Sequence, residues 1–136
     1  MLLGRLQLKG SGAVAVDQLI EDAHRAATDV EPGRLAGELQ ELLGQKLVAF
    51  AVGDRHPRTI GRYARGERLP ESQTLGRLVD IYTVVRILGE GMRESSIKSW
   101  MLGSNPRLKG KAPIEAIHDG RAYEVMGAAR AFVARR

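Results

Sequence analysis

Apolar residues recur at intervals of three and four along most of this chain, which is the spacing that places them on one face of an α-helix. The longest such pattern runs from about Ser72 to Gly89 or Gly91 and contains Leu75, Leu78, Val79, Tyr82, Val85 and Leu88. No segment shows sustained alternation of apolar and polar residues between turn signals, the pattern typical of strands. We therefore expect an all-α fold with seven or eight helices.

Glycine, proline and capping residues indicate where the other helices begin and end. Residues 1–16 are expected to be weakly structured, and Asp17 is the expected N-cap of a helix that ends near Thr28. Further helices are expected at residues 31–43, 45–52, 57–65, 94–102, 113–118 and 122–134. Residues 103–112, which contain Asn105-Pro106 and Lys109-Gly110, are expected to form a shaped loop.

The positive charge of the chain is concentrated in one short segment. The formal net charge is +5, and residues 53–68, with five arginines and two acids, contribute +3 of it. Clustered basic charge is the electrostatic footprint of a protein that binds a polyanion. The alternative is a solvated arginine-rich surface, and charge alone does not separate the two.

Within this segment, residues 57–70 read PRTIGRYARGERLP and predict a short helix with one basic face. Three arginines fall at i, i+4 and i+7 on that face: Arg58, Arg62 and Arg65. Tyr63 lies beside the apolar positions of the helix, so we expect it to pack into the core. Together with the helix at 45–52 and the turn at 53–56, this helix forms a candidate helix-turn-helix.

In a helix-turn-helix, the first residues of the second helix meet base edges in the major groove. Arg58, Thr59 and Arg62 occupy these forward positions, and both residue types can bond bases. Three further arginines are better placed for phosphates, which fix the register on DNA without reading sequence: Arg55, Arg65 and Arg68.

Several other chemistries have no support in the sequence. The chain has no Cys, which excludes disulfides and thiolate chemistry and fits a reducing cytoplasm. Its three histidines are scattered, so no metal site is expected. Phosphate-binding and dinucleotide-binding glycine motifs are missing, and we expect neither enzymatic activity nor a cofactor. We also expect no signal peptide and no membrane partner, and hence a cytoplasmic protein.

The segment from Trp100 onward carries a more specific pattern. Trp100 is followed by Asn105-Pro106, Leu108, Gly110, Pro113, Ile114, Ile117, Gly120 and Val125. This series resembles the toxin-binding domain of the MbcA/ParS/Xre antitoxins, which are paired with RES-domain toxins. The upstream arginine and aromatic, Arg62 and Tyr63, resemble that family's Xre-like helix-turn-helix. The resemblance covers about residues 35–136.

The resemblance implies an N-terminal helix-turn-helix followed by a small helical toxin-binding domain. The implied division is an extension of unknown role at 1–34, a helix-turn-helix region at 35–71, a connecting or dimerisation helix at 72–92 and a toxin-binding domain at 93–136. Such an antitoxin is not a catalyst. It occludes the active site of a RES toxin that consumes NAD or transfers ADP-ribose, and it binds its own promoter as an autorepressor.

The implied partners are a RES-domain toxin and operator DNA, with a homodimer and a larger toxin–antitoxin hetero-oligomer as the assemblies. The expected toxin-binding residues are Trp100, Asn105, Arg107, Lys109, Arg130, Phe132, Arg135 and Arg136. Two interpretations stay open for several of them. Trp100 either packs against the 106–113 loop or contacts the toxin, and the tail from Arg130 either enters the toxin's pocket or completes the core. A stand-alone Xre-like repressor without a toxin, or a helical module that binds only protein, are the alternative functions.

Overall fold

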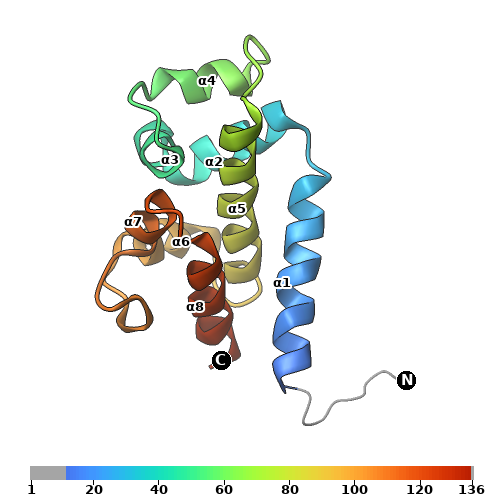
Figure 1. The fold of residues 1–136 in the computed structure, drawn as a ribbon, viewed down its shortest axis with the longest axis vertical. Helices are drawn as coiled ribbons and strands as arrows, with labels where there is room; N and C mark the ends of the chain where they lie inside the picture. The colour runs from blue at the N-terminus through green and yellow to red at the C-terminus, as the bar shows by residue number, and fades with distance from the viewer. Residues whose placement is uncertain (1–11, 136) are drawn as a thin grey trace.

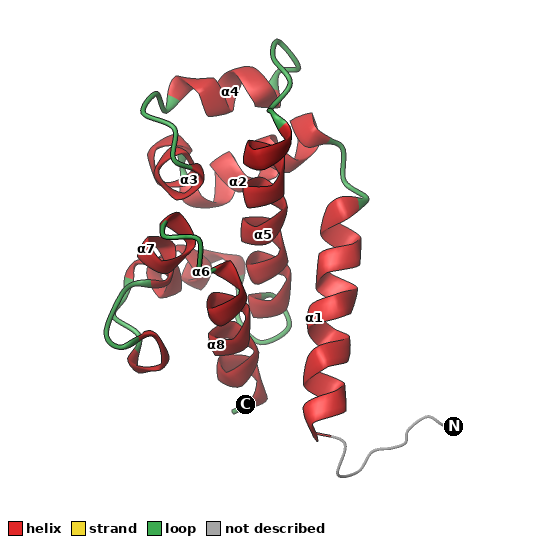
Figure 2. Cartoon of the chain, viewed as in Figure 1, coloured by secondary structure: helices red, strands yellow, loops and turns green. Residues whose placement is uncertain are grey.

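The computed structural model describes residues 12–135, and this part of the chain contains helices and loops but no strand (Figure 2). The all-α prediction is therefore confirmed. The elements are α1 (Gly12–Thr28), α2 (Pro32–Leu43), α3 (Gln45–Val52), α4 (Arg58–Ala64), α5 (Ser72–Leu88), α6 (Glu94–Leu102), the 3-10 helix η1 (Pro106–Leu108), α7 (Pro113–His118) and α8 (Ala122–Ala134).

The observed helix ends agree with the sequence prediction except at the N-terminus. α3, α6, α7 and α8 have the expected bounds. α1, however, begins at Gly12, so residues 12–16 are helical and Asp17 lies inside the helix instead of capping it. The prediction gave too much weight to a capping residue. Ala13 and Ala15 before it have high helix propensity, and no proline interrupts the run.

Helix α5 is the central element of the fold. Figure 1 shows it running down the middle of the molecule, and α1, α2, α3 and α8 all pack against it. Its buried residues include Leu78, Ile81, Val84 and Ile87, each fully shielded from solvent. α5 is buried on several sides and connects the two halves of the chain within one core. The dimer contact expected within residues 72–92 stays a prediction.

The α2–α5 contact contains a polar link. The Tyr82 hydroxyl donates to Glu38 Oε1 at 2.6 Å, and Arg34 Nε donates to the other oxygen at 2.7 Å. The tyrosine hydrogen bond, followed by that of the arginine, lowers the pKa of Glu38. Burial, followed by the hydrogen bond to Glu38, raises the pKa of Tyr82. Glu38 therefore joins α2 to α5.

The N-terminal and C-terminal halves meet where the last turns of α3 and α7 face α5. Arg77 of α5 donates through Nη1 to the carbonyl oxygens of Ala51 and His118, each at 3.1 Å, and lies 3.4 Å from that of Ile117. Beside it, the rings of Phe50 and His118 stack with centroids 4.4 Å apart. Both contacts tie α3 to α7 and so join the N-terminal half of the fold to the C-terminal half.

Candidate functional site

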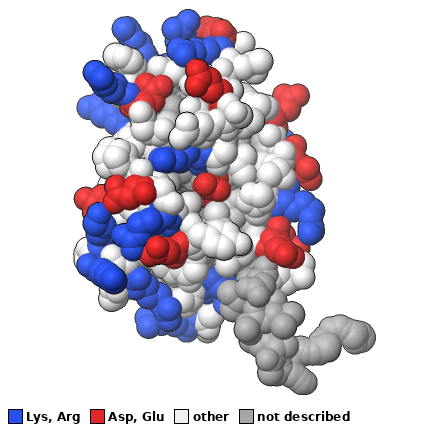
Figure 3. All heavy atoms as spheres, in the orientation of Figure 1, with Lys and Arg blue, Asp and Glu red and all other residues white. Residues whose placement is uncertain are grey.

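Two surfaces carry the residues that the sequence singled out, and the first surrounds α4. α4 packs on α2 and α3 at one end of the molecule. Figure 3 shows several Lys and Arg side chains projecting from the upper end, where Figure 1 places α4. All five arginines of residues 53–68 are exposed. We refer to Arg55, Arg58, Arg62, Arg65 and Arg68 as the α4 arginine surface.

Most of this surface has no counter-charge of its own. Only Arg65 is paired, through Nε to Glu67 Oε2 at 2.8 Å, and this hydrogen bond lowers the pKa of Glu67. Within residues 12–135, the other four arginines form no ion pair. Unpaired guanidinium groups on one exposed surface are available to bind phosphate oxygens.

The inner side of α4 belongs to the core. Tyr63 is 4% exposed, which confirms its predicted packing role. Thr59 is also buried, at 6% exposed, so its hydroxyl offers little to a base, and we leave it out of the DNA surface proposed below. A Cβ added at Gly61 would lie 2.6 Å from Gln45 Nε2, so a side chain there would displace Gln45 of α3. Nothing in the local sequence around Gly61 indicates this close approach.

Glycines shape both ends of α4. Gly53 follows α3 with φ +82° and Gly66 follows α4 with φ +74°, a conformation that only glycine adopts readily. Between α3 and α4, Asp54 Oδ1 accepts from the His56 backbone N–H at 2.8 Å, which closes the connection. The helix-turn-helix geometry of this pair stays a prediction.

The second surface is a small groove between α6, η1 and α8. It has a volume of about 110 Å³ and is lined by Trp100, Asn105, Pro106, Arg107, Ala128, Phe132 and Arg135. We call it the Trp100–Phe132 groove. The two rings lie edge to face, with centroids 6.4 Å apart and planes at 64°. Trp100 is half-buried, so it packs against the loop and also forms a wall of the groove.

Five of the eight expected toxin-binding residues line this groove: Trp100, Asn105, Arg107, Phe132 and Arg135. Lys109 and Arg130 do not line it, and Arg136 lies outside the described residues. Figure 3 shows Lys and Arg side chains at the lower left, where Figure 1 places the loop before α7 and the end of α8. The groove therefore combines aromatic walls with a basic rim.

Asn105 shapes the loop from within. Its side-chain oxygen accepts from the Arg107 backbone N–H at 2.9 Å, and its carbonyl accepts from the N–H groups of Leu108 and Gly110. Lys109 adopts φ +59°, which turns the chain back toward α7. These hydrogen bonds hold the backbone from which Arg107 reaches the groove. Asn105 therefore positions Arg107 and also lines the groove.

The end of α8 packs on the fold. Val133 is partly buried against the core, and Phe132, at 38% exposed, lies against Trp100. The Nε of Arg130 is buried without a hydrogen-bond partner among the described residues. α8 extends to Ala134 and its end packs on the core. The positions of Phe132 and Val133 agree with the alternative in which the tail completes the core.

Two further observations bear on the kind of site. Among residues 12–135, no group of three or more His, Cys, Asp or Glu side chains is arranged to hold a metal ion. In the same range, no helix is long and apolar enough to cross a membrane.

Comparison with known proteins gives two sequence relationships. A family model described as the Rv2175c C-terminal domain of unknown function matches residues 82–133, which include every residue that lines the Trp100–Phe132 groove except Arg135. Over 75 residues the chain is 26% identical to the mycobacterial cidal antitoxin MbcA of Mycobacterium tuberculosis and of Mycobacterium bovis. The aligned region is 55% of this chain and 66% of the length of these relatives, which makes the chain a distant homologue of MbcA.

The fold also matches a solved structure. A chain of the crystal structure of the Mycobacterium tuberculosis MbcT–MbcA toxin–antitoxin complex superposes with a TM-score of 0.66, at 23% identity. The match covers 78% of this chain and 97% of that chain. At this identity the likeness establishes the fold.

Proposed function

We propose that this protein is an antitoxin that neutralises a toxin of the MbcT kind by binding it through the Trp100–Phe132 groove. The observation that carries the proposal is the coincidence of sequence relationship and site. The domain matched at residues 82–133 contains every residue of the groove except Arg135, and the chain is a distant homologue of an antitoxin.

The groove suits a protein partner with an apolar side chain beside an acidic one. Trp100 and Phe132 offer ring surface that is partly exposed, and aromatic residues in pockets are the usual anchors of protein interfaces. Arg107 and Arg135 at the rim would pair with carboxylates of the partner. The finer form of the proposal, from the family resemblance, is that the partner is a RES-domain toxin whose active site is occluded.

The α4 arginine surface supports a second activity of the same protein, the binding of operator DNA. Arg55, Arg58, Arg62 and Arg68 are exposed and unpaired within the described residues, and α4 lies at one end of the fold, open to a large ligand. Two copies in a homodimer would present two such surfaces to half-sites about 34 Å apart or a multiple of that. Autorepression would then couple synthesis of the antitoxin to its own amount.

Neutralisation is tested by co-expression in a bacterial host with the RES-domain toxin encoded in the adjacent reading frame. The wild-type chain should restore growth. Trp100→Ala combined with Phe132→Ala should fail to do so, while Leu69→Ala, which removes an exposed leucine near α4, should still protect. If all three chains protect equally, the groove is not the toxin-binding site. If none of them protects, the protein does not neutralise this toxin.

DNA binding is tested by the salt dependence of affinity for the promoter fragment. Each phosphate contact that is lost lowers the slope of log K against log salt by about 0.9, so replacing the two unpaired arginines placed for phosphates, Arg55→Ala plus Arg68→Ala, should lower it by about 1.8. Arg93→Ala, an exposed arginine before α6, is the matched control and should leave the slope unchanged. DNA binding without toxin neutralisation would instead favour the stand-alone repressor.

A further inference from the structure

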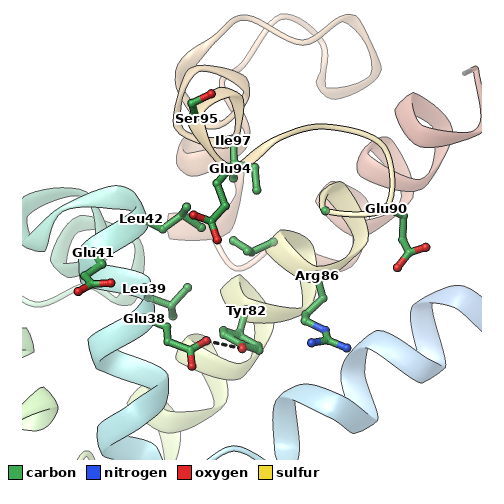
Figure 4. A pocket seen from close by; sticks show the side chains of 12 residues that line it. Glu38, Leu39, Glu41, Leu42, Tyr82, Arg86, Glu90, Glu94, Ser95 and Ile97 are labelled. Atoms are coloured by element: carbon green, nitrogen blue, oxygen red, sulfur yellow. Dashed lines mark hydrogen bonds between the residues drawn. The ribbon is translucent and has the colours of Figure 1, made fainter.

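A third cavity shares no residue with either surface described above. It has a volume of about 780 Å³ and lies between α2, α5 and the start of α6 (Figure 4). Its floor is apolar and is formed by Leu39, Leu42, Val85 and Ile97. We call it the α2–α5–α6 groove. Leu42 and Val85 are only partly buried, so a ligand would cover apolar surface that now faces solvent.

The rim of the groove is acidic. Glu38, Glu41, Glu90 and Glu94 line it, against the single cation Arg86. Glu38 is already held by Tyr82 and Arg34. The other three glutamates are exposed and form no ion pair with any residue of 12–135. An apolar floor with an unpaired acidic rim is complementary to a segment that is both apolar and basic.

The chain contains such a segment at residues 1–11, outside the described part. It reads MLLGRLQLKGS, with four leucines, two cations and no acid. We propose that residues 1–11 bind in the α2–α5–α6 groove of their own chain. The leucines cover the apolar floor, and Arg5 and Lys9 pair with glutamates of the rim.

The geometry of the helices gives this segment the reach it needs. α1 packs along α5 and runs in the opposite direction, with His24 close enough to Asp80 to influence its pKa (Figure 1). From His24 back to Gly12 is about 18 Å of helix, and from Asp80 on to the end of α5 at Leu88 is about 12 Å. Gly12 and Leu88 therefore lie at the same end of the molecule, with α1 and α5 about 10 Å apart.

Eleven extended residues span at most about 36–40 Å, several times this separation. In Figure 4, Arg86 and Glu90 lie on the side of the groove that faces α1. A bound segment would contact α2, α5 and α6 at once. Because α4 packs on α2, the segment would brace the half that carries the α4 arginine surface against the half that carries the Trp100–Phe132 groove.

The chain has no native cysteine, so one introduced pair reports directly on this contact. Gln7→Cys keeps all four leucines and both cations, and Ser95→Cys places the second thiol at the groove. The control pair is Gln7→Cys with Gln18→Cys, an exposed position on α1 that lies about 9 Å along the helix from Gly12, within reach of an unbound segment and outside the groove. After mild oxidation of the full-length chain, we expect the groove pair to form an intramolecular disulfide about tenfold faster than the control pair.

Equal rates for the two pairs would overturn the proposal. A covalent dimer in place of an internal disulfide would also overturn it, because the segment would then occupy the groove of a second copy. The charge match is tested by Glu90→Lys plus Glu94→Lys, which should slow the cross-link, and by adding Arg5→Glu plus Lys9→Glu, which should restore it. Failure of the combined reversal to restore the rate would show that the rim does not hold the cations.

Discussion

Replacing Arg77 by methionine should loosen the junction between the two halves of the fold. The methionine keeps most of the aliphatic stem but removes the guanidinium that serves the carbonyls of Ala51, Ile117 and His118. One Nη1 carries two hydrogens, so we count the two bonds at 3.1 Å and treat the contact at 3.4 Å as minor. Each charge-assisted bond at this partly buried position contributes about 1–1.5 kcal/mol, which gives a loss of about 2–3 kcal/mol.

Urea unfolding followed by the fluorescence of Trp100, the only tryptophan, measures this loss in free energy of unfolding. For a domain of ordinary stability, 2–3 kcal/mol is about a quarter to a half of the total. Arg93→Met is the control, because Arg93 is exposed and its side chain makes no capping hydrogen bond to α6. It should change the free energy of unfolding by less than about 0.5 kcal/mol. If Arg77→Met costs no more than the control, the three carbonyl contacts do not hold the halves together.

Three further changes test other parts of the structure. Tyr82→Phe should cost about 1 kcal/mol at neutral pH, because Glu38 loses its 2.6 Å donor. Because the pKa of Glu38 is lowered in the fold, its charged form contributes stability above the carboxylate's ordinary pKa of about 4.3. This contribution is lost as pH falls through the pKa in the folded state, so the difference in free energy of unfolding between wild type and Tyr82→Phe should shrink in acid, as measured by urea unfolding. Asp80→Asn should raise the urea midpoint at pH 7, because burial raises the pKa of Asp80 and its charged form opposes folding. This gain in stability should vanish below about pH 3.9, where the carboxyl is protonated in both states. A lower midpoint at pH 7 would contradict the prediction. Gly66→Ala should cost about 1 kcal/mol in thermal unfolding from backbone strain alone, because its φ is +74° and an added Cβ would meet nothing within 4 Å.

The helices were predictable because local signals and tertiary packing agree. α3, α6 and α8 follow apolar stripes bounded by glycine or by capping loops, and their ends needed no long-range information. The start of α1 was mispredicted because Asp17 is a good N-cap in isolation, whereas the preceding residues continue the helix. Propensity along several residues outweighed one capping residue there.

Contacts between distant segments were not predictable from one sequence. Phe50 and His118 are 68 positions apart, and nothing in the local pattern of either indicates the ring stack. The same holds for Arg77, which has the composition of a solvated helix position but bonds two helix ends. Exposure is similarly a tertiary property, and it separates buried Thr59 from exposed Arg58 beside it.

The candidate surfaces were found to different extents. The α4 arginine surface was visible in the sequence because helical spacing alone gathers Arg58, Arg62 and Arg65. The Trp100–Phe132 groove required the fold, since Trp100 and Phe132 come from different helices and Arg107 comes from the loop between them. The eight residues were predicted individually, from the family resemblance and from the basic and apolar end of the chain, and the structure brings five of them together.

The central claim, that this protein binds a toxin through the Trp100–Phe132 groove, is tested most directly by titrating the purified RES-domain toxin with the wild-type chain and with Trp100→Ala plus Phe132→Ala. Loss of two aromatic anchors whose exposed ring surface the toxin would cover should weaken binding by about 2–4 kcal/mol, or roughly 30-fold to 1,000-fold in Kd. Circular dichroism should show both chains equally helical. Wild-type affinity in the folded double variant would contradict the account.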